Sequence, residues 1–161
     1  MNPKEDALAI FKAAVDRVDP EAMIERAVSI QGAPGEESLV VRSGLEEARY
    51  ELSRYDRVFA AGMGKASGAM ARGLEKALGD RLAGGIVAVK EGQHTELKRI
   101  RLLEAGHPGP NERSLAAAQA ILGLGASLGT RLTERDLVVV LVSGGGSAIL
   151  CAPAEGLSLA D

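Results

Sequence analysis

The sequence predicts an α/β domain of three layers with a mainly parallel sheet, preceded by N-terminal helices. From residue 56 onward, short apolar runs alternate with helical patterns, and strands separated by helices form right-handed βαβ units with parallel strands. The run at 137–142 is apolar throughout, as expected of a strand buried on both faces of such a sheet. Glycine-rich loops directly follow two of the runs, at the strand ends where open α/β sheets bind ligands. The expected architecture is therefore Rossmann-like.

Two helices are expected ahead of the sheet. Apolar residues recur at helical spacing and predict the first helix over residues 4–18. Asp19 is a typical N-cap, and Pro20 suits the first position of a helix. A second helix should therefore follow and end at about Ile30, just before Gly32.

The segment that joins these helices to the sheet is ambiguous. Residues 39–41 are expected to form a short strand. In the stretch 45–53, Ser43 and Glu46 are spaced as in a capping box, which favours a helix. The pattern around Tyr50 alternates as in a strand, and a small hairpin is the favoured interpretation.

The remaining elements follow from the alternation of strands and helices. Strands are expected at residues 58–61, 85–90, 100–105 and 137–142. A helix is expected over about 65–78, where Gly79 supplies a stop. Another is expected over about 112–122, with Asn111 as its N-cap.

Composition and charge exclude several classes of protein. The chain has 161 residues, of which 46% are hydrophobic, enough for one domain with a core. A net charge of −3 and an aromatic content of 2% argue against a nucleic-acid surface, and no apolar run is long enough to span a bilayer. The start is unlike a signal peptide, so a cytoplasmic location is expected. Cys151 is the only cysteine and there are two histidines, so neither a disulfide nor a metal site is predicted.

The first glycine loop runs from Gly62 to Ser67. It is not a P-loop, because Phe59 stands where that motif needs a glycine, and in the dinucleotide-binding motif Ser67 would replace the third glycine. Free backbone N–H groups at a helix start favour phosphate or carboxylate, and Lys65 adds a positive charge. Gly62, Gly64 and Ser67 are therefore predicted to contact substrate or phosphate. The alternative is a tight turn with an exposed lysine.

The second glycine loop follows the strand at 137–142. Its predicted contacts with substrate or phosphate are Ser143, Gly144, Gly145, Gly146 and Ser147. Between a strand and an apolar segment, a structured turn whose backbone can approach a ligand is favoured over a flexible linker. A nucleophilic serine is the third interpretation, but neither serine lies in a G-x-S-x-G motif and no partner residues are evident.

His107 is the third candidate. It lies in a loop, 106–111, that contains two prolines and two glycines. Because this loop also follows a strand, His107 is expected at the same edge of the sheet, where it could donate to a substrate oxygen or act as an acid or base. The alternative is a histidine that only packs or caps. His94 is expected to be a solvated loop residue.

Together the three loops resemble those of one family, the glycerate 2-kinases, which carry the older label hydroxypyruvate reductases. The resemblance rests on Gly62 to Ser67 with Met70-Ala71, Gly106 to Asn111 with Ser114, and Ser143 to Ala148 with Pro153, Gly156 to Leu159 and Asp161. It holds in order and spacing from about residue 4 to the end of the chain.

The resemblance implies a function and a domain organisation. Members of this family transfer phosphate from ATP to a hydroxyl of D-glycerate, giving 2-phosphoglycerate, with a divalent cation such as Mg²⁺. Residues 1–161 would be the amino-terminal α/β domain, incomplete at its C-terminal end, with a second kinase domain beyond residue 161 and the active site between the two. Lys65 is implied to be the catalytic residue, and the loop 143–147 to hold substrate or phosphate. ATP and Mg²⁺ would be held mostly by parts outside this chain, and a homo-oligomer is compatible with the resemblance.

Two other functions remain open at this point. Sugar-phosphate isomerases and related phosphosugar-binding domains carry a similar glycine-lysine-serine turn after their first strand, although Ala66 interrupts that pattern here. A catalytically inactive fragment or interaction domain is the other alternative.

Overall fold

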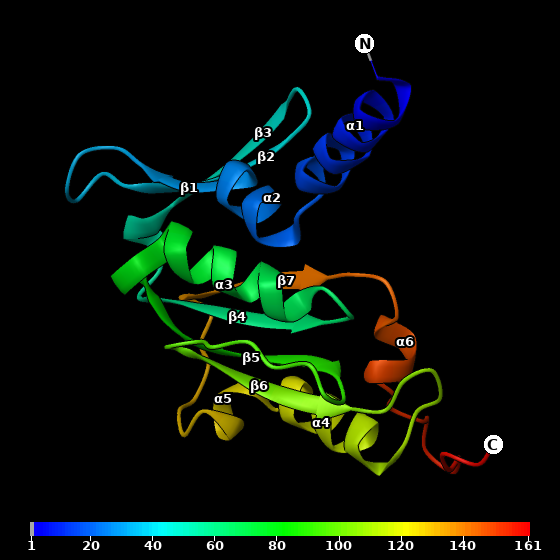
Figure 1. Ribbon diagram of the computed structural model, residues 1–161. Coiled ribbons are helices and arrows are strands. Elements are labelled where there is room, and N and C mark those ends of the chain that lie inside the picture. The colour runs from blue at the N-terminus through cyan, green and yellow to red at the C-terminus, as the bar shows by residue number, and fades with distance from the viewer. Residues whose placement is uncertain (1) are drawn as a thin grey trace.

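The computed structural model describes residues 2–161 and has the predicted three-layer α/β architecture (Figure 1). Its helices are α1 (Pro3–Arg17), α2 (Pro20–Ala27), α3 (Ser67–Leu78), α4 (Glu112–Leu122), α5 (Leu124–Ser127) and α6 (Gly146–Ile149). Its strands are β1 (Val28–Gln31), β2 (Ser38–Ser43), β3 (Glu46–Glu51), β4 (Arg57–Met63), β5 (Leu82–Lys90), β6 (Ile100–Ala105) and β7 (Asp136–Val142).

The central sheet has the strand order β6-β5-β4-β7, and all of its neighbouring strands pair in parallel. Helix α3 covers one face and helices α4 and α5 cover the other (Figure 1). Side chains of β4 alternate between the two layers: Ala60 belongs to the core with Leu74 of α3, and Phe59 belongs to the core with Leu124 of α5. Because the four strands run in the same direction, their carboxyl ends and the loops that follow them lie at one edge of the sheet.

A second sheet of three antiparallel strands, β1-β2-β3, packs over α2 and α3 (Figure 1). The expected hairpin is confirmed by the pairing of β2 with β3. The prediction that the second helix ends at about Ile30 was wrong, because that helix ends at Ala27 and the next four residues form β1. The β-branched Val28 and Ile30 are well suited to a strand, and pairing with β2 outweighs the local helical pattern.

The prediction that residues 137–142 are buried on both faces was also wrong. Strand β7 lies at the edge of the sheet and pairs with β4. Leu141 points into the core that α3 covers and is buried, whereas Val140 and Val142 on the other face are 60% and 58% exposed. Helices α4 and α5 cover that face beneath β5 and β6, and they leave the end of β7 uncovered.

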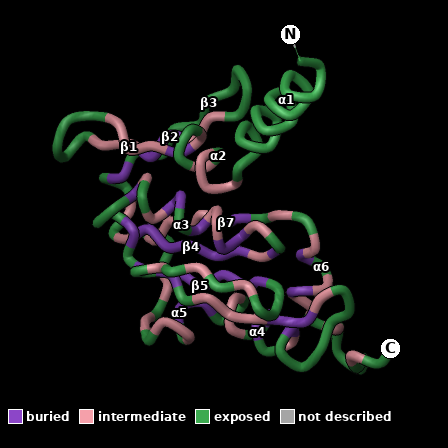
Figure 2. The backbone as a smooth tube through the Cα atoms, viewed as in Figure 1, coloured by how far each residue is buried: buried purple, intermediate pink, exposed green. Residues whose placement is uncertain are grey.

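Helix α1 stands apart from both sheets (Figure 1), and it is exposed along its length (Figure 2). Its start is capped by the Asn2 side chain, which accepts a hydrogen bond from the Lys4 N–H. Ile10 and Phe11 on its apolar side remain 72% and 65% exposed. Among the described residues, α1 is therefore stabilised by its N-cap and by helix propensity and not by burial.

The start of β7 is fixed to β4 by a paired arginine and aspartate. The Arg57 guanidinium donates to both carboxylate oxygens of Asp136, at 2.7 and 2.8 Å, and also to the hydroxyl of Thr130 and the carbonyl of Arg131. The Asp136 side chain is only 1% exposed. The hydrogen bonds from Arg57, aided by those from Thr133, lower the pKa of Asp136 from 3.8 to about 2.

We expect this pair to make the stability depend on pH. Because the pKa is lower in the folded state, the contribution of Asp136 is complete above about pH 5 and is lost as the pH falls from about 4 to about 2. Asp136→Asn should therefore lower the Tm at neutral pH, and the difference from the wild type should shrink over that acid range. The measurement is the Tm from pH 7 to pH 2.

Asp56→Asn is the matched control. Asp56 pairs with Arg135, and both side chains are 57% exposed, so the effect on the Tm should be much smaller. A Tm difference for Asp136→Asn that is the same at pH 7 and pH 2 would show that the pair acts by packing rather than by charge.

Candidate functional site

The three loops singled out in the sequence meet at the carboxyl edge of the central sheet (Figure 1). They follow β4, β6 and β7, which run in parallel. A Cβ atom on Gly145 would lie 3.1 Å from Nε2 of His107 and 3.3 Å from Cε of Lys65. The expectation that these loops share one edge is confirmed. The ligand that each of them binds stays a prediction.

The backbone of the first loop is fully engaged within the chain. The N–H groups of residues 64–67 donate to the carbonyl of Ala88, the carbonyl of Gly144, the hydroxyl of Ser143 and the carbonyl of Gly64, in that order. This differs from the expectation that these N–H groups would hold an anion. The loop instead presents the side chain of Lys65, which is exposed.

The Ser67 side chain faces the protein interior. It is fully buried, and its hydroxyl lies 2.8 Å from the carbonyl of Gly64 and 2.7 Å from that of Ala88. A hydroxyl in this position holds the loop against β5 and cannot reach the edge surface. That Ser67 contacts substrate or phosphate stays a prediction, and in this structure its hydroxyl is occupied within the chain. Gly62 is buried too, where a Cβ atom would lie 2.8 Å from the Leu141 carbonyl, so it serves close strand packing.

The second loop carries the free donors that the first one lacks. Within residues 2–161, the N–H groups from Gly144 to Ala148 form no hydrogen bond of normal geometry to another loop or strand. Gly144 faces open space, and Ser147 is exposed. Gly145 has φ of 87°, a conformation that suits glycine. This run of N–H groups beside Lys65 and His107 fits a phosphate or carboxylate.

His107 is half-buried, and its loop is fixed by the start of α4. The buried Ser114 hydroxyl accepts hydrogen bonds from the N–H groups of Gly106 and Asn111, at 3.2 and 3.1 Å. Asn111 in turn caps α4 through the N–H groups of Arg113 and Ser114. The expected N-cap is confirmed, and the arrangement holds His107 beside Gly145.

Sequence reasoning missed Gln93. Its Nε2 donates to the carbonyl of Lys65 at 2.6 Å, from the loop between β5 and β6. The same loop contacts the start of α3, where a Cβ atom on Gly68 would lie 2.7 Å from Oγ1 of Thr95. A single glutamine in a polar loop carries no sequence signal of such a contact. His94, its neighbour, is exposed as expected.

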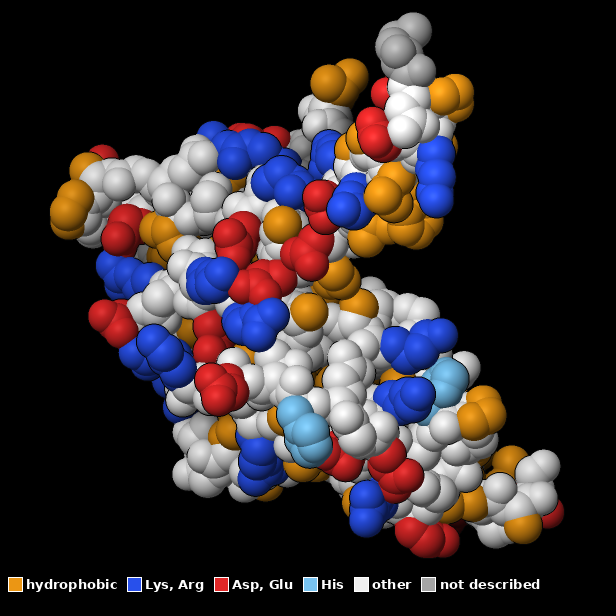
Figure 3. Space-filling model, viewed as in Figure 1, with side chains coloured by type: hydrophobic (Ala, Val, Ile, Leu, Met, Phe, Trp, Pro, Cys, Tyr) orange, Lys and Arg blue, Asp and Glu red, His pale blue; other side chains and the backbone are white. Residues whose placement is uncertain are grey.

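The donor set of this edge fits an anionic group and not a metal ion. Figure 3 shows basic and histidine side chains gathered on the molecule where the strands end. Across residues 2–161, no three His, Cys, Asp or Glu side chains are grouped so as to hold a metal ion. None of the helices in this part of the chain is long and apolar enough to cross a membrane.

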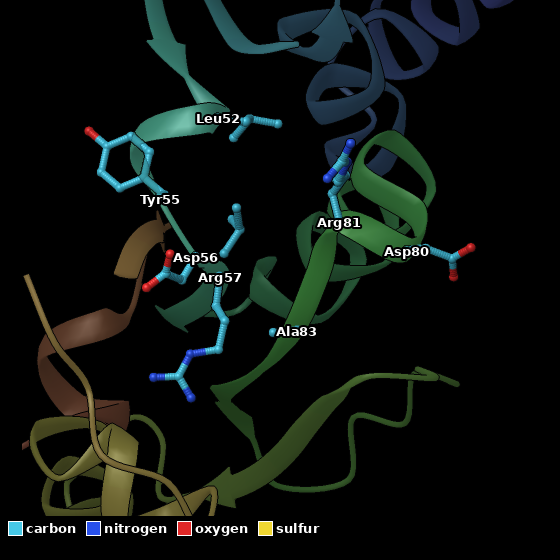
Figure 4. A pocket seen from close by; sticks show the side chains of 8 residues that line it. Leu52, Tyr55, Asp56, Arg57, Asp80, Arg81 and Ala83 are labelled. Carbon is cyan, nitrogen blue, oxygen red and sulfur yellow. The ribbon is translucent and has the colours of Figure 1, made fainter. Parts of the chain in front are cut away.

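A pocket of about 170 Å³ lies at the opposite edge, beside the start of β4 (Figure 4). It is lined by Leu52, Tyr55, Asp56, Arg57, Val58, Asp80, Arg81 and Ala83. Its four charged side chains all form ion pairs within the chain. The pocket therefore offers a ligand only charges that are already paired, and it is a weaker candidate than the three loops.

The sequence of this chain matches one family of proteins and is similar to several proteins that have names. Residues 6–161 match the family described as "Domain of unknown function (DUF4147)". The chain is 35% identical over 161 residues to the "Glycerate 2-kinase" of Pyrococcus horikoshii, covering 100% of this chain and 33% of that protein. It is 43% identical over 105 residues to a "Putative hydroxypyruvate reductase" of Agrobacterium vitis, covering 65% and 26% of the two.

A solved structure agrees with these similarities. The crystal structure of a Pyrococcus horikoshii protein matches with a TM-score of 0.79 and 33% identity, over 99% of this chain and 33% of that one. The resemblance inferred from the three loops is confirmed. The chain spans about a third of the length of these relatives, or less.

Proposed function

We propose, from the premise that this chain belongs to the DUF4147 family, that it supplies one wall of the active site of an ATP-dependent glycerate 2-kinase. The observation that carries the proposal is the edge at which Lys65, His107 and the free N–H groups of residues 144–148 come together. The names of similar proteins point to glycerate as the substrate. The second wall, most of the ATP site and the ligands for Mg²⁺ would lie outside these residues.

In the proposed phosphoryl transfer, the residues of this wall would mainly position the reactants and stabilise charge. A hydroxyl oxygen of D-glycerate would attack the γ-phosphorus of ATP, the bond from that phosphorus to the bridging oxygen would break, and ADP would leave. Such a transfer is accelerated mainly by orientation and by stabilisation of charge on the phosphoryl oxygens. Lys65 and the N–H groups of the second loop would supply that stabilisation. His107 would receive the hydroxyl proton or orient that hydroxyl.

Two alternatives fit the same edge less well. A reductase would need to bind a dinucleotide pyrophosphate on free N–H groups at the turn after the first strand, and here the N–H groups of residues 64–67 are occupied. A phosphosugar-binding domain would use hydroxyls in that turn, and the hydroxyl of Ser67 is buried. The occupied first loop therefore favours a kinase, in which Lys65 acts through its side chain.

The test is an assay of the protein expressed from its complete gene, with D-glycerate and Mg-ATP. We expect glycerate-dependent formation of ADP, with 2-phosphoglycerate identified by ³¹P NMR. Residues 1–161 expressed alone should show no turnover, because the wall they form is only part of the proposed site. Reduction of hydroxypyruvate by NADH without any phosphorylation of glycerate would refute the kinase proposal, and phosphorylation by residues 1–161 alone would refute the division of the site.

A further inference from the structure

We infer that Ser143 and Gln93 are positioning residues, which fix the direction of the Lys65 side chain instead of contacting the substrate. The inference rests on the proposed function and assigns these two residues a role within the site. Two peptide groups flank the Cα atom of Lys65, and their orientation sets the direction in which its side chain leaves the backbone. The N–H and the carbonyl of Lys65 and the N–H of Ala66 each form a hydrogen bond with a neighbouring loop.

Two other loops hold the backbone on either side of Lys65. The Lys65 N–H donates to the Gly144 carbonyl at 3.0 Å, from the loop after β7. The Lys65 carbonyl accepts from Nε2 of Gln93 at 2.6 Å, from the loop after β5. The Ala66 N–H donates to Oγ of Ser143 at 3.0 Å. Because both flanking peptides are fixed, the φ and ψ angles of Lys65 are fixed, and with them the direction of its Cα–Cβ bond.

The hydroxyl of Ser143 is turned toward the first loop. Besides accepting from Ala66, it packs against Gly64 so closely that a Cβ atom there would overlap it. The Ser143 N–H donates to the Met63 carbonyl at 3.0 Å. Ser147, at the other end of the second loop, is exposed, and its side chain makes no such contact with residues 2–161. The two serines flanking the glycines therefore differ: Ser143 joins the loops, and Ser147 is left to face a ligand.

The hydrogen bonds between the first and second loops set the distance between the charge of Lys65 and the free N–H groups. Those groups begin at Gly144, the residue after Ser143 and the one whose carbonyl accepts from Lys65. Loss of the Ser143 hydroxyl would loosen the lysine relative to these donors without removing either. Stabilisation of a transferred phosphoryl group depends on such geometry more than binding of the ground state does. The effect should therefore appear in kcat rather than in KM.

The experiment compares Ser143→Ala, Ser143→Thr and Gln93→Ala in the complete protein, with Ser53→Ala as a control at an exposed site outside the three loops. Loss of one hydrogen bond should lower kcat for D-glycerate by about tenfold, with KM unchanged within about twofold. Ser143→Thr, which keeps the hydroxyl, should restore most of kcat. Ser53→Ala should match the wild type.

Hydrogen exchange separates this inference from the proposed function. Measured by mass spectrometry on fragments that contain Ala66, exchange should quicken by up to about tenfold in Ser143→Ala and not in Ser53→Ala. This result decides whether the Ser143 hydroxyl holds the Ala66 N–H, even if the protein phosphorylates another acceptor. Unchanged exchange in Ser143→Ala overturns the inference. A rise in KM at constant kcat overturns it too, since it would mean that Ser143 contacts the substrate.

Discussion

Lys65→Ala is expected to lower kcat for phosphorylation of D-glycerate by about a hundredfold to a thousandfold, the usual cost of removing a group that stabilises developing charge. The Lys65 ammonium is the one full positive charge that the first loop contributes to the edge. Its side chain is exposed and forms no ion pair with residues 2–161, so the Tm should not change. The measurements are steady-state kinetics of ADP formation and a thermal melt of the same preparation.

Two further variants sharpen this result. Lys98→Ala removes an exposed lysine that lies before the start of β6, away from the three loops, and should leave kcat within about twofold of the wild type. Lys65→Arg keeps the charge but replaces a compact ammonium with a planar guanidinium, so partial activity is expected. Turnover by Lys65→Ala equal to that of Lys98→Ala would remove Lys65 from the catalytic machinery.

The outline of this site could be predicted because it follows from topology. Strands joined by helices run in parallel, so loops that follow strands gather at one edge whatever the order of the strands. That rule predicts that Lys65, His107 and the loop 143–147 lie at the same edge. The resemblance to a known family rested on the same loops, and the fold bears it out.

The errors have a common cause, which is that burial and pairing depend on distant parts of the chain. The surroundings of Ser67 show the same dependence, because the carbonyl that accepts from its hydroxyl belongs to Ala88, 21 residues away. The apolar run of β7 does not reveal that the strand lies at an edge. Residues 28–31 fit a helix locally and become a strand only because β2 lies beside them.

Gly64→Ala is expected to disrupt the contact between the first and second glycine loops more severely than the loss of a single hydrogen bond would. Gly64 has φ of 121°, which an L-residue adopts only under strain. A Cβ atom there would overlap the hydroxyl of Ser143 and lie 2.5 Å from its carbonyl oxygen. Both effects together should lower the free energy of unfolding by roughly 2–5 kcal/mol, measured by urea denaturation.

Two other glycines separate the causes, because each shares part of the environment of Gly64. Gly35 has φ of 89° but open space around it, so Gly35→Ala should show the cost of backbone strain alone. Gly144 has open space and no positive φ, so Gly144→Ala should change stability by less than about 0.5 kcal/mol. If Gly64→Ala costs no more than Gly35→Ala, the overlap with Ser143 carries no energy and the two loops are not rigidly joined. If it costs clearly more, the excess measures how firmly the second loop holds the lysine loop in place.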